Sequence, residues 1–418
     1  MKQDSSRPGM FPRLALHVAA VAMVQATSTT IAALLPVLAR KRFGAGEWET
    51  LFITAAPTVF FTFSIFWNDL FSHTRFLRYI LVFWAIACLP LTLVAFATSY
   101  WMLLVPHLLC SLGGAGYHPA AGEVLKRLYP DGLRGRIYGV VWGFTLVTGA
   151  VLGYTLGAWL SRNEEAFRIF LPVAAGVQLV GVLILAFLAS RTGVDVGRVR
   201  VVEDRSFFDR VVEPVTHMRE VLKADPVFAR YEAAYMTYGI GWMICYALLP
   251  VFVTDRLHLN YDQIAGSTQV AYLVGMVLMI GPAGYLMDRL GAVRSTGLSF
   301  LMLIAYPMGL MASNDAASLA IVSFVYGLSH AGTSVGWMLG PVALAPSPAK
   351  VPQYVAIHAT FVGIRGKIFQ GLGVLIYSLT HGFTLPFLLA AGAFAWSAVQ
   401  MWRLDRLMRP SRRAEVSP

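Results

Sequence analysis

Long apolar runs separated by short polar breaks make up nearly the whole chain. Stretches of about eighteen or more apolar residues recur along it, each long enough to cross the ~30 Å hydrocarbon core of a bilayer as an α-helix. This pattern predicts an all-α membrane protein with twelve transmembrane helices. The predicted spans are roughly 14–39, 48–67, 76–98, 101–126, 136–160, 167–190, 227–253, 264–286, 292–312, 316–341, 353–378 and 384–403.

Composition supports the same conclusion. Of the 418 residues, 57% are hydrophobic and 13% are charged, whereas soluble domains have about 25% charged residues. The first run begins at Leu14 and has no small-residue cleavage site behind it, so we expect a retained span and not a removed signal peptide. The three cysteines lie inside predicted spans and indicate neither a disulfide framework nor a metal site. We expect no metal and no cofactor.

A long polar segment divides the chain into halves. We expect an N-terminal six-helix bundle at 1–190, a cytoplasmic linker at 191–226 and a C-terminal six-helix bundle at 227–418. Within the linker, residues 207–222 have the pattern of an amphipathic helix that lies on the membrane surface.

The distribution of positive charge predicts the orientation. Most of the 33 lysines and arginines fall at the two termini or in loops that follow even-numbered spans. By the positive-inside rule both termini and the linker are then cytoplasmic. The net charge of +11 is therefore an orientation signal with some affinity for membrane lipid headgroups, and we expect no nucleic-acid partner. The expected location is the bacterial cytoplasmic (inner) membrane, as a multi-pass protein.

The two halves contain matching segments. Residues 33–37 and 247–251 both read ALLPV, at the ends of the first and seventh spans. Residues 284–294 read GYLMDRLGAVR, and 67–75 read WNDLFSHTR with an aspartate in the same place. The first of these loops fits G-x-x-x-D-R-x-G-x-x-R, and the chain thereby resembles the major facilitator superfamily (MFS) of secondary transporters.

This resemblance implies two six-helix bundles that alternate access to a central site. It also implies cytoplasmic gating contacts by Asp288 and Arg289, and by Asp69 and Arg75 in the degraded first copy, which lacks the usual glycines. The other interpretation of these loops is a capped, solvated helix end.

In the family, spans one, four, seven and ten line the substrate cavity. Three of these spans carry polar or aromatic stripes at helical spacing. Helix packing or an interfacial belt is the alternative explanation for the aromatic residues. The residues we expect to line the substrate and proton pathway are His107, Tyr117 and His118 in span four, Tyr235, Tyr238 and Trp242 in span seven, and His330 and Trp337 in span ten.

Span eleven contributes ionisable residues within an apolar run. Arg365 lies mid-span with His358 on its face, and Lys367 points the opposite way. Ionisable groups in hydrocarbon are costly and by default face protein or water. A guanidinium binds a carboxylate or phosphonate bidentately, and histidines exchange protons near physiological pH. Whether Glu232 and Lys367 are functional or structural stays open.

The stretch GGAGYHPAAGE at 113–123 is unusual for a span. Pro119 lacks an N–H group, so the carbonyl of Ala115 loses its helical partner and a kink is expected there. The stretch resembles span four of fosmidomycin-resistance-type exporters, which handle small anionic compounds. A packing kink with a structural His118 is the competing interpretation.

No ATP-binding loop or hydrolase motif occurs, so we expect no enzyme. The sequence predicts proton-coupled efflux of a small organic, anionic solute by a monomer. An importer or facilitator of an organic acid is the alternative, and a transporter-like sensor or assembly protein that moves nothing is the hypothesis from another class.

Overall fold

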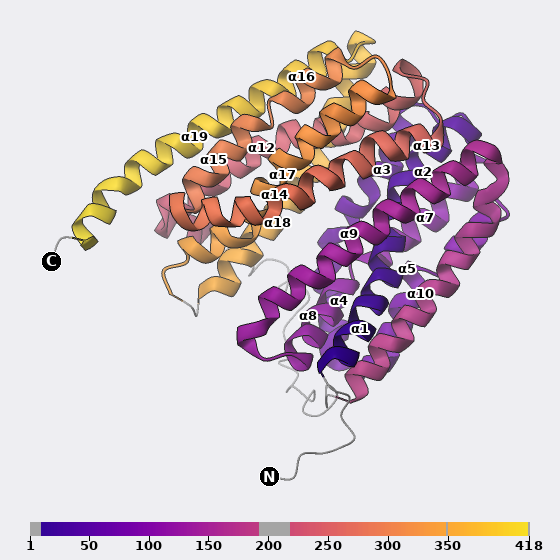
Figure 1. The fold of residues 1–418 in the computed structure, drawn as a ribbon, viewed down its shortest axis with the longest axis horizontal. Coiled ribbons are helices and arrows are strands. Elements are labelled where there is room, and N and C mark those ends of the chain that lie inside the picture. Colours follow the sequence, from indigo (N-terminus) through magenta and orange to yellow (C-terminus); the bar gives the residue numbers. More distant parts are fainter. Residues whose placement is uncertain (1–9, 192–217, 348–349, 417–418) are drawn as a thin grey trace. The chain divides into compact units, whose positions relative to one another are not determined.

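The computed structural model describes residues 10–191, 218–347 and 350–416, and every regular element in these ranges is helical (Figure 1). Ten helical stretches of the described residues are long and apolar enough to span a membrane. Clustering of contacts divides the chain into two compact units, Met1–Val201 with His258–Val270, and Val202–Leu257 with Ala271–Pro418. The expectation of an all-helical membrane protein is confirmed.

The first unit begins with one long rod made of three consecutive helical elements. Its elements are α1 (Met10–Val21), the π-helix η1 (Ala22–Ala26), α2 (Thr27–Phe43), α3 (Glu47–Phe60), the 3₁₀ turn η2 (Phe61–Phe63), α4 (Ser64–His73), α5 (Phe76–Ala87), α6 (Leu91–Val94), α7 (Tyr100–Gly114), α8 (Tyr117–Leu128), α9 (Asp131–Arg162), η3 (Glu164–Ala166), α10 (Phe167–Ser190), α13 (Tyr261–Ile264) and the π-helix η5 (Ala265–Val270).

Helix α10 packs against α1, η1 and α5 in this unit. Polar side chains there form hydrogen bonds with polar groups on neighbouring helices, because the membrane interior offers no water to satisfy them. The Trp84 indole donates to the carbonyl of Ala175 at 2.9 Å, and the Gln178 amide donates to the Ser28 hydroxyl at 2.8 Å. These bonds connect α5 and α2 to α10.

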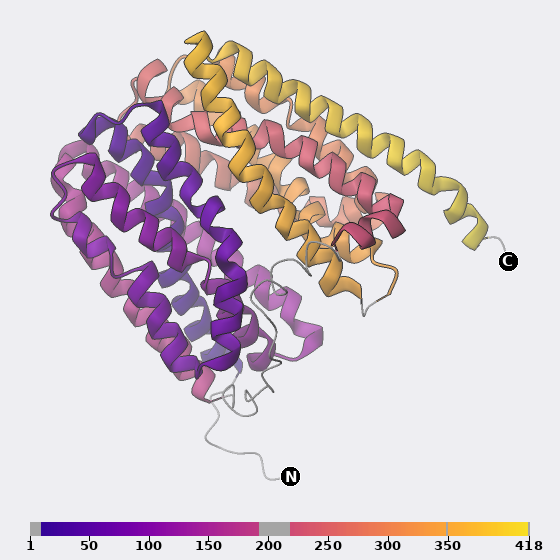
Figure 2. The ribbon, with the colours of Figure 1, turned by 180° about the vertical axis from the view of Figure 1, so that it is seen from behind.

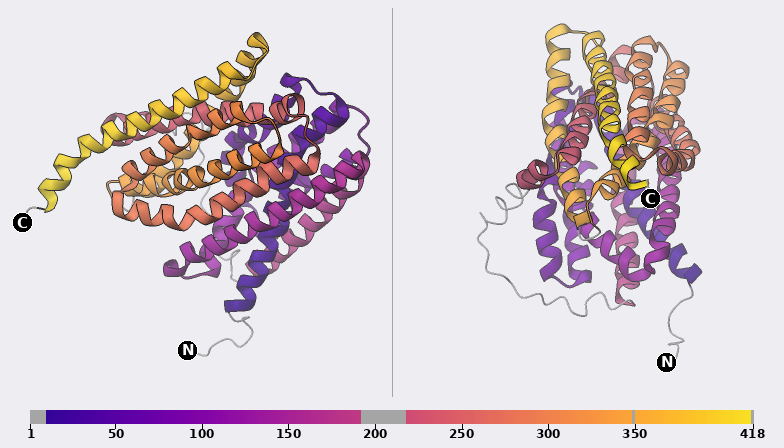
Figure 3. Two further views of the ribbon diagram at one scale, coloured as in Figure 1. Left: turned by 45° about the horizontal axis from the view of Figure 1, so that its top comes forward. Right: turned by 90° about the vertical axis from the view of Figure 1, so that its left-hand side faces the viewer.

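The second unit holds the remaining helices. They are α12 (Pro226–Val251), the π-helix η4 (Phe252–Arg256), α14 (Ala271–Leu290), α15 (Ala292–Met302), α16 (Ala305–Ala312), α17 (Ala316–Leu344), α18 (Val351–Thr380) and α19 (Thr384–Val416). Helix α12 packs against α18 and α19, an arrangement visible from behind in Figure 2, and α14 packs against α17. The C-terminal end of α19 extends past the other helices of its unit (Figures 1 and 3).

Two predicted spans are interrupted. The predicted span 48–67 consists of α3, η2 and α4, and the predicted span 101–126 consists of α7 and α8. Neither is therefore among the ten long apolar helices. The predicted surface helix at 207–222 falls mostly outside the described residues. Residues 218–224 are helical, and Met218, Val221 and Leu222 pack against a small core that contains Phe228 and Tyr354.

Candidate functional site

Three ionisable side chains lie buried together between α12 and α18 of the second unit. Glu232 on α12 is 2% exposed, and His358 and Arg365 on α18 are 2% and 3% exposed. Charged groups are rarely buried unless they are paired or bound to something. The partners of each group therefore indicate what the cluster can do.

Glu232 and His358 form a hydrogen-bonded pair. The Nδ1 atom of His358 lies 2.8 Å from Oε1 and 2.9 Å from Oε2 of Glu232. When Glu232 is ionised its carboxylate only accepts hydrogen bonds, and Nδ1 is then the donor. In the neutral ring the second nitrogen, Nε2, then holds a lone pair. Nε2 is buried and has no hydrogen-bond partner among the described residues, so it is the atom that can accept a proton.

Arg365 is held by a carbonyl and two ring faces, with one donor left unused. Its Nη1 donates to the backbone oxygen of Tyr235 at 2.9 Å. The guanidinium carbon lies 5.3 Å from the ring centre of Tyr238 and 5.8 Å from that of Trp242, within the range of cation–π attraction. The Nε group is buried and has no hydrogen-bond partner in the described part of the chain. Arg365 thus has a spare N–H for an acceptor such as an anion.

A glycine on α12 makes room for the arginine stem. A Cβ atom built on Gly239 would lie 2.2 Å from Cδ of Arg365, far inside ordinary van der Waals contact. The arginine therefore lies flat against the α12 backbone because position 239 has no side chain.

Aromatic side chains enclose the three ionisable groups. The Tyr235 ring lies 4.8 Å from the His358 ring, edge to face, and the Trp337 ring lies 5.6 Å from it. The hydroxyls of Tyr235 and Tyr231 donate to the carbonyls of Thr333 and Gly336 on α17 at 3.0 and 2.9 Å. These hydroxyls are committed to helix packing, and their rings form the wall around His358.

Trp242 connects this cluster to a second one around His330. The Trp242 indole donates to the Tyr326 hydroxyl at 2.8 Å, and its ring stacks on His330 at 5.9 Å. The Nδ1 atom of His330 lies 2.8 Å from the hydroxyl of Tyr272 on α14. Trp242, Tyr272, Tyr326, His330 and Trp337 are all half-buried, so this side of the cluster reaches the surface of the unit.

The second unit thus gathers many of the residues singled out from the sequence. Glu232, left open there, pairs with His358 at the centre. Tyr272 was missed, because span eight is not among those the family uses to line its cavity. The gathered residues are Tyr235, Tyr238, Trp242, His330, Trp337, His358 and Arg365.

In the first unit, His107 has a structural partner. Pro57 has no N–H, so the carbonyl of Ile53, four residues earlier in α3, lacks its helical donor. The Nε2 atom of the buried His107 on α7 lies 2.9 Å from that oxygen, and it can supply the missing hydrogen. This bond gives the histidine at position 107 a role in helix packing.

The glycine-rich stretch breaks the fourth predicted span at Ala115 and Gly116, between α7 and α8. Gly116 N–H turns back to the carbonyl of Gly113 at 2.9 Å. The Trp67 indole donates to the carbonyl of Leu112 at 2.9 Å, and the Tyr79 hydroxyl donates to that of Gly116 at 2.7 Å. Side chains from α4 and α5 thereby satisfy carbonyls at the break, as a membrane interior requires.

Pro119 is the third residue of α8, within the first turn, where a missing N–H costs nothing. The interruption therefore lies just before the proline, at the predicted place. Tyr117 is buried with its hydroxyl unpartnered, whereas His118 is exposed and its ring lies 5.6 Å from that of Phe61.

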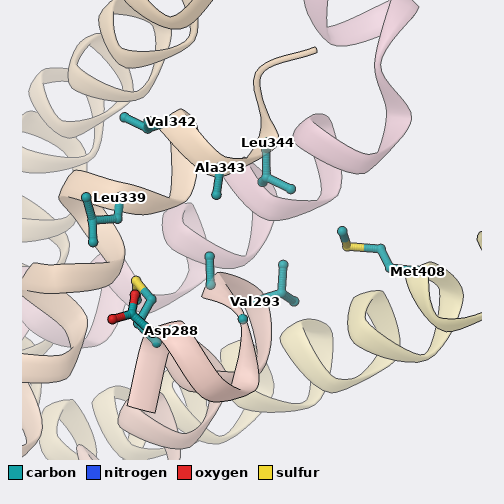
Figure 4. A pocket seen from close by; sticks show the side chains of 10 residues that line it. Asp288, Val293, Leu339, Val342, Ala343, Leu344 and Met408 are labelled. Atoms are coloured by element: carbon teal, nitrogen blue, oxygen red, sulfur yellow. The ribbon is translucent and has the colours of Figure 1, made fainter. Parts of the chain in front are cut away.

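The loop between α14 and α15 places its charged pair at the surface. Asp288 and Arg289 are exposed, and the guanidinium of Arg289 lies 5.0 Å from the Tyr285 ring. Asp288 borders an otherwise apolar pocket of about 310 Å³ that includes Val293 and Leu339 (Figure 4).

In the first-half copy of this loop, Arg75 is exposed at the start of α5. The side chain of Asp69 lies outside the described residues.

The comparisons agree with the resemblance noted in the sequence. The profile of the Major Facilitator Superfamily matches residues 17–268. The chain was also compared with curated proteins, and none matched in sequence.

Several solved structures share the fold. The peptide transporter POT in complex with sulfate is 13% identical with a TM-score of 0.73, covering 97% of both chains. The nucleoside transporter NupG is 12% identical with a TM-score of 0.73, covering 94% of this chain and 99% of the other. An inward-facing bacterial homolog of the human lysosomal transporter Spinster is 14% identical with a TM-score of 0.56, covering 96% and 95%. The chain belongs to the major facilitator superfamily and is a multi-pass integral membrane protein with the fold of its transporters.

Proposed function

We propose that this protein carries a small organic anion across the membrane by alternating access, in a step coupled to protons. The observation that supports it most directly is Arg365, buried in α18 with an unused Nε–H beside the Glu232–His358 pair. A donor in this position is unsatisfied until an acceptor arrives, and an anion satisfies both its charge and its hydrogen bond.

The charges around Arg365 favour a singly charged anion. Glu232 interacts electrostatically with Arg365, so the two formal charges cancel while His358 is neutral. A singly charged solute is therefore favoured over one with several charges. The surrounding faces of Tyr238 and Trp242 suit an organic group next to the anionic head, because aromatic surfaces bind apolar and ring-bearing groups well.

We also propose a topology of twelve transmembrane spans. The interrupted pairs α3–α4 and α7–α8 complete a set of twelve spans when added to the ten long apolar helices. With both termini cytoplasmic, the bundles at 1–190 and 227–418 are the two halves of the alternating-access cycle. We place the protein in the bacterial inner membrane as a monomer.

The charged loops supply the gating contacts in this scheme. Asp288 and Arg289 are exposed and free to meet a partner surface, which supports a cytoplasmic latch that forms and breaks in each cycle. Asp69 and Arg75 are the corresponding pair in the first half. His118, exposed beside the break between α7 and α8, lies at the point where this helix pair can bend.

Direction depends on how proton and anion share the site. Efflux in exchange for protons, the first expectation from the sequence, requires that a bound proton weakens anion binding. Uptake, the alternative, requires that proton and anion bind together.

Transport by the purified full chain in proteoliposomes tests the proposal. The flux of radiolabelled benzenesulfonate, benzoate and lactate is measured with and without an imposed pH gradient, with tetraphenylphosphonium as the cationic comparison. We expect flux of at least one anion, accelerated by the gradient, and none of the cation. Flux of the cation alone would refute an anion site, and no flux of any probe would favour the non-transporting sensor.

Substitution of the arginine sharpens the test. Arg365→Gln removes a hydrogen bond to a charged group, worth about 1.5–3 kcal/mol, and should slow anion flux roughly 10- to 150-fold. Lys367→Gln is the matched control, because Lys367 is a cation two residues away on the same helix with an exposed side chain. Equal losses in the two variants would contradict a specific role for Arg365.

A further inference from the structure

The buried Glu232–His358 pair has a geometry that assigns each partner a different task. We propose that His358 is the residue that takes up the proton, at Nε2, and that Glu232 is its positioning residue. We further propose that the bound proton strengthens anion binding at Arg365, so that proton and anion cross the membrane together. This inference rests on the proposed function, because it takes Arg365 as the anion ligand.

The hydrogen bonds fix where the proton goes. Both oxygens of Glu232 lie within 2.9 Å of Nδ1, so that nitrogen keeps its hydrogen in the neutral and in the protonated ring. The added proton then has one place to go, Nε2, which is buried without a partner. Protonation turns this lone pair into an N–H donor, and the site gains a second unsatisfied donor about two helical turns from Arg365 on α18.

Protonation of His358 also changes the net charge of the cluster. Before protonation, Glu232 carries one negative charge and Arg365 one positive charge, and the neutral His358 leaves the sum at zero. Protonation at Nε2 raises the sum to one positive charge within a buried region, where charges interact more strongly than in water. An anion that binds then restores neutrality.

The other groups facing His358 do not offset this change. From α12, Tyr231 and Tyr235 face the ring, and both hydroxyls donate to carbonyls of α17, so they stay neutral. From α17, the Trp337 ring faces His358 and carries no charge. Among the described residues, Glu232 is the charged group that contacts His358, and Arg365 lies about two helical turns further along α18.

Reciprocity of binding gives the direction of transport. If a proton strengthens anion binding, the anion strengthens proton binding by the same factor, and couplings between two ligands are typically about 5- to 150-fold. A carrier that prefers to hold both moves both in one direction. An inward proton gradient then drives uptake of the anion and not its efflux.

Equilibrium binding to the purified full chain tests the sign of this coupling. The probe is radiolabelled benzenesulfonate, because a sulfonate stays ionised and any pH dependence must come from the protein. Affinity is measured at about pH 5.5 and about pH 8, on either side of the histidine reference value. We expect binding roughly tenfold tighter at the lower pH.

Substitutions separate the two partners. His358→Gln should remove the pH dependence and leave weak binding at both pH values. Glu232→Gln removes a negative charge, so it should tighten binding at about pH 8, whereas loss of a merely structural residue would weaken it. If His358→Gln fails to fold because Glu232 is left unpaired, the double variant Glu232→Gln/His358→Gln keeps a neutral pair. It should bind with no pH dependence.

His17→Gln is the matched control. His17 is another buried histidine, in the first unit, where its Nδ1 lies 3.3 Å from the Tyr129 hydroxyl. This variant should keep the tenfold ratio between the two pH values.

A measurement without ligand checks the same proton. The Trp337 ring lies 5.6 Å from His358, and a protonated imidazole at that range quenches indole fluorescence. The fluorescence of Trp337 is obtained as the difference in emission between the parent chain and Trp337→Phe. This fluorescence should fall on acidification in the parent chain and stay constant in the His358→Gln background.

The outcomes distinguish the inference from the proposed function. Equal affinity at both pH values would overturn the inference and leave anion transport standing. Tighter binding at the higher pH would overturn it in favour of exchange and efflux. No binding or flux of any anionic probe would overturn the proposed function and the inference with it.

Discussion

Replacing Gly239 with alanine should displace Arg365. The added Cβ would lie 2.2 Å from Cδ of the arginine, about 1.3 Å or more inside the contact distance of two carbon atoms. The arginine stem has to move by that amount, and the Nη1 bond to Tyr235, now 2.9 Å, would stretch beyond hydrogen-bond length. A lost bond from a charged group costs about 1.5–3 kcal/mol.

The assay combines anion flux in proteoliposomes with thermal unfolding in detergent. Gly239→Ala should reduce anion flux roughly 10- to 100-fold, in line with the lost bond. It should also lower the unfolding temperature, because overpacking costs about 1–3 kcal/mol.

Gly371→Ala on α18 is the matched control. A Cβ there meets nothing within 4 Å, and alanine is the better helix former by about 1 kcal/mol, so flux should be unchanged and stability equal or higher. Unchanged flux and stability in Gly239→Ala would refute the packing argument and with it the placement of Arg365.

The remaining predictions concern the break and a helix cap. Tyr79→Phe removes the donor to the Gly116 carbonyl at the α7–α8 break. It should lower the free energy of unfolding by about 1–3 kcal/mol, measured by thermal unfolding. An equal loss in Tyr154→Phe, at an exposed tyrosine, would contradict this. Hydrogen bonds from Ser318 hold the pKa of the Asp315 cap below its usual range. Its stabilisation is thus present above about pH 4 and lost on acidification. Asp315→Asn should lower the unfolding temperature at neutral pH, by a margin that shrinks in acid.

The hydrophobic pattern predicted the helices well where apolar runs were long and uninterrupted. The predicted span 167–190 matches α10, Phe167–Ser190, and 316–341 lies within α17, Ala316–Leu344. In both, almost every backbone group finds its partner within the helix, so apolar length alone decides the element.

The pattern did not predict where helices are interrupted. In span 48–67 the first helix ends at Phe60, and the carbonyl that its internal Pro57 leaves unpaired lies 2.9 Å from a nitrogen of His107. That partner comes from a helix about fifty residues away in the sequence, so no local pattern contains it. The kink near Pro119 was predicted from the proline itself, but its donors, Trp67 and Tyr79, were not.

Helical spacing anticipated some of the residues that the structure brings together, but none of their pairings. Helical spacing placed His358 and Arg365 on one face of their span, and the structure places both beside α12. Glu232 stayed ambiguous because it lies near a predicted helix end, where an acid is often solvated. Its pairing with His358, 126 residues later, depends on how α12 packs against α18.

Proton flux caused by the anion tests the central claim most directly. Benzenesulfonate is added outside proteoliposomes that contain a pH-sensitive dye, with no gradient imposed at the start. The account predicts that the anion carries protons inward. The interior should acidify in the parent chain and in Lys367→Gln, at least roughly tenfold more slowly in Arg365→Gln, and not at all in His358→Gln. Interior alkalinisation, or acidification at the parental rate in Arg365→Gln, would contradict it.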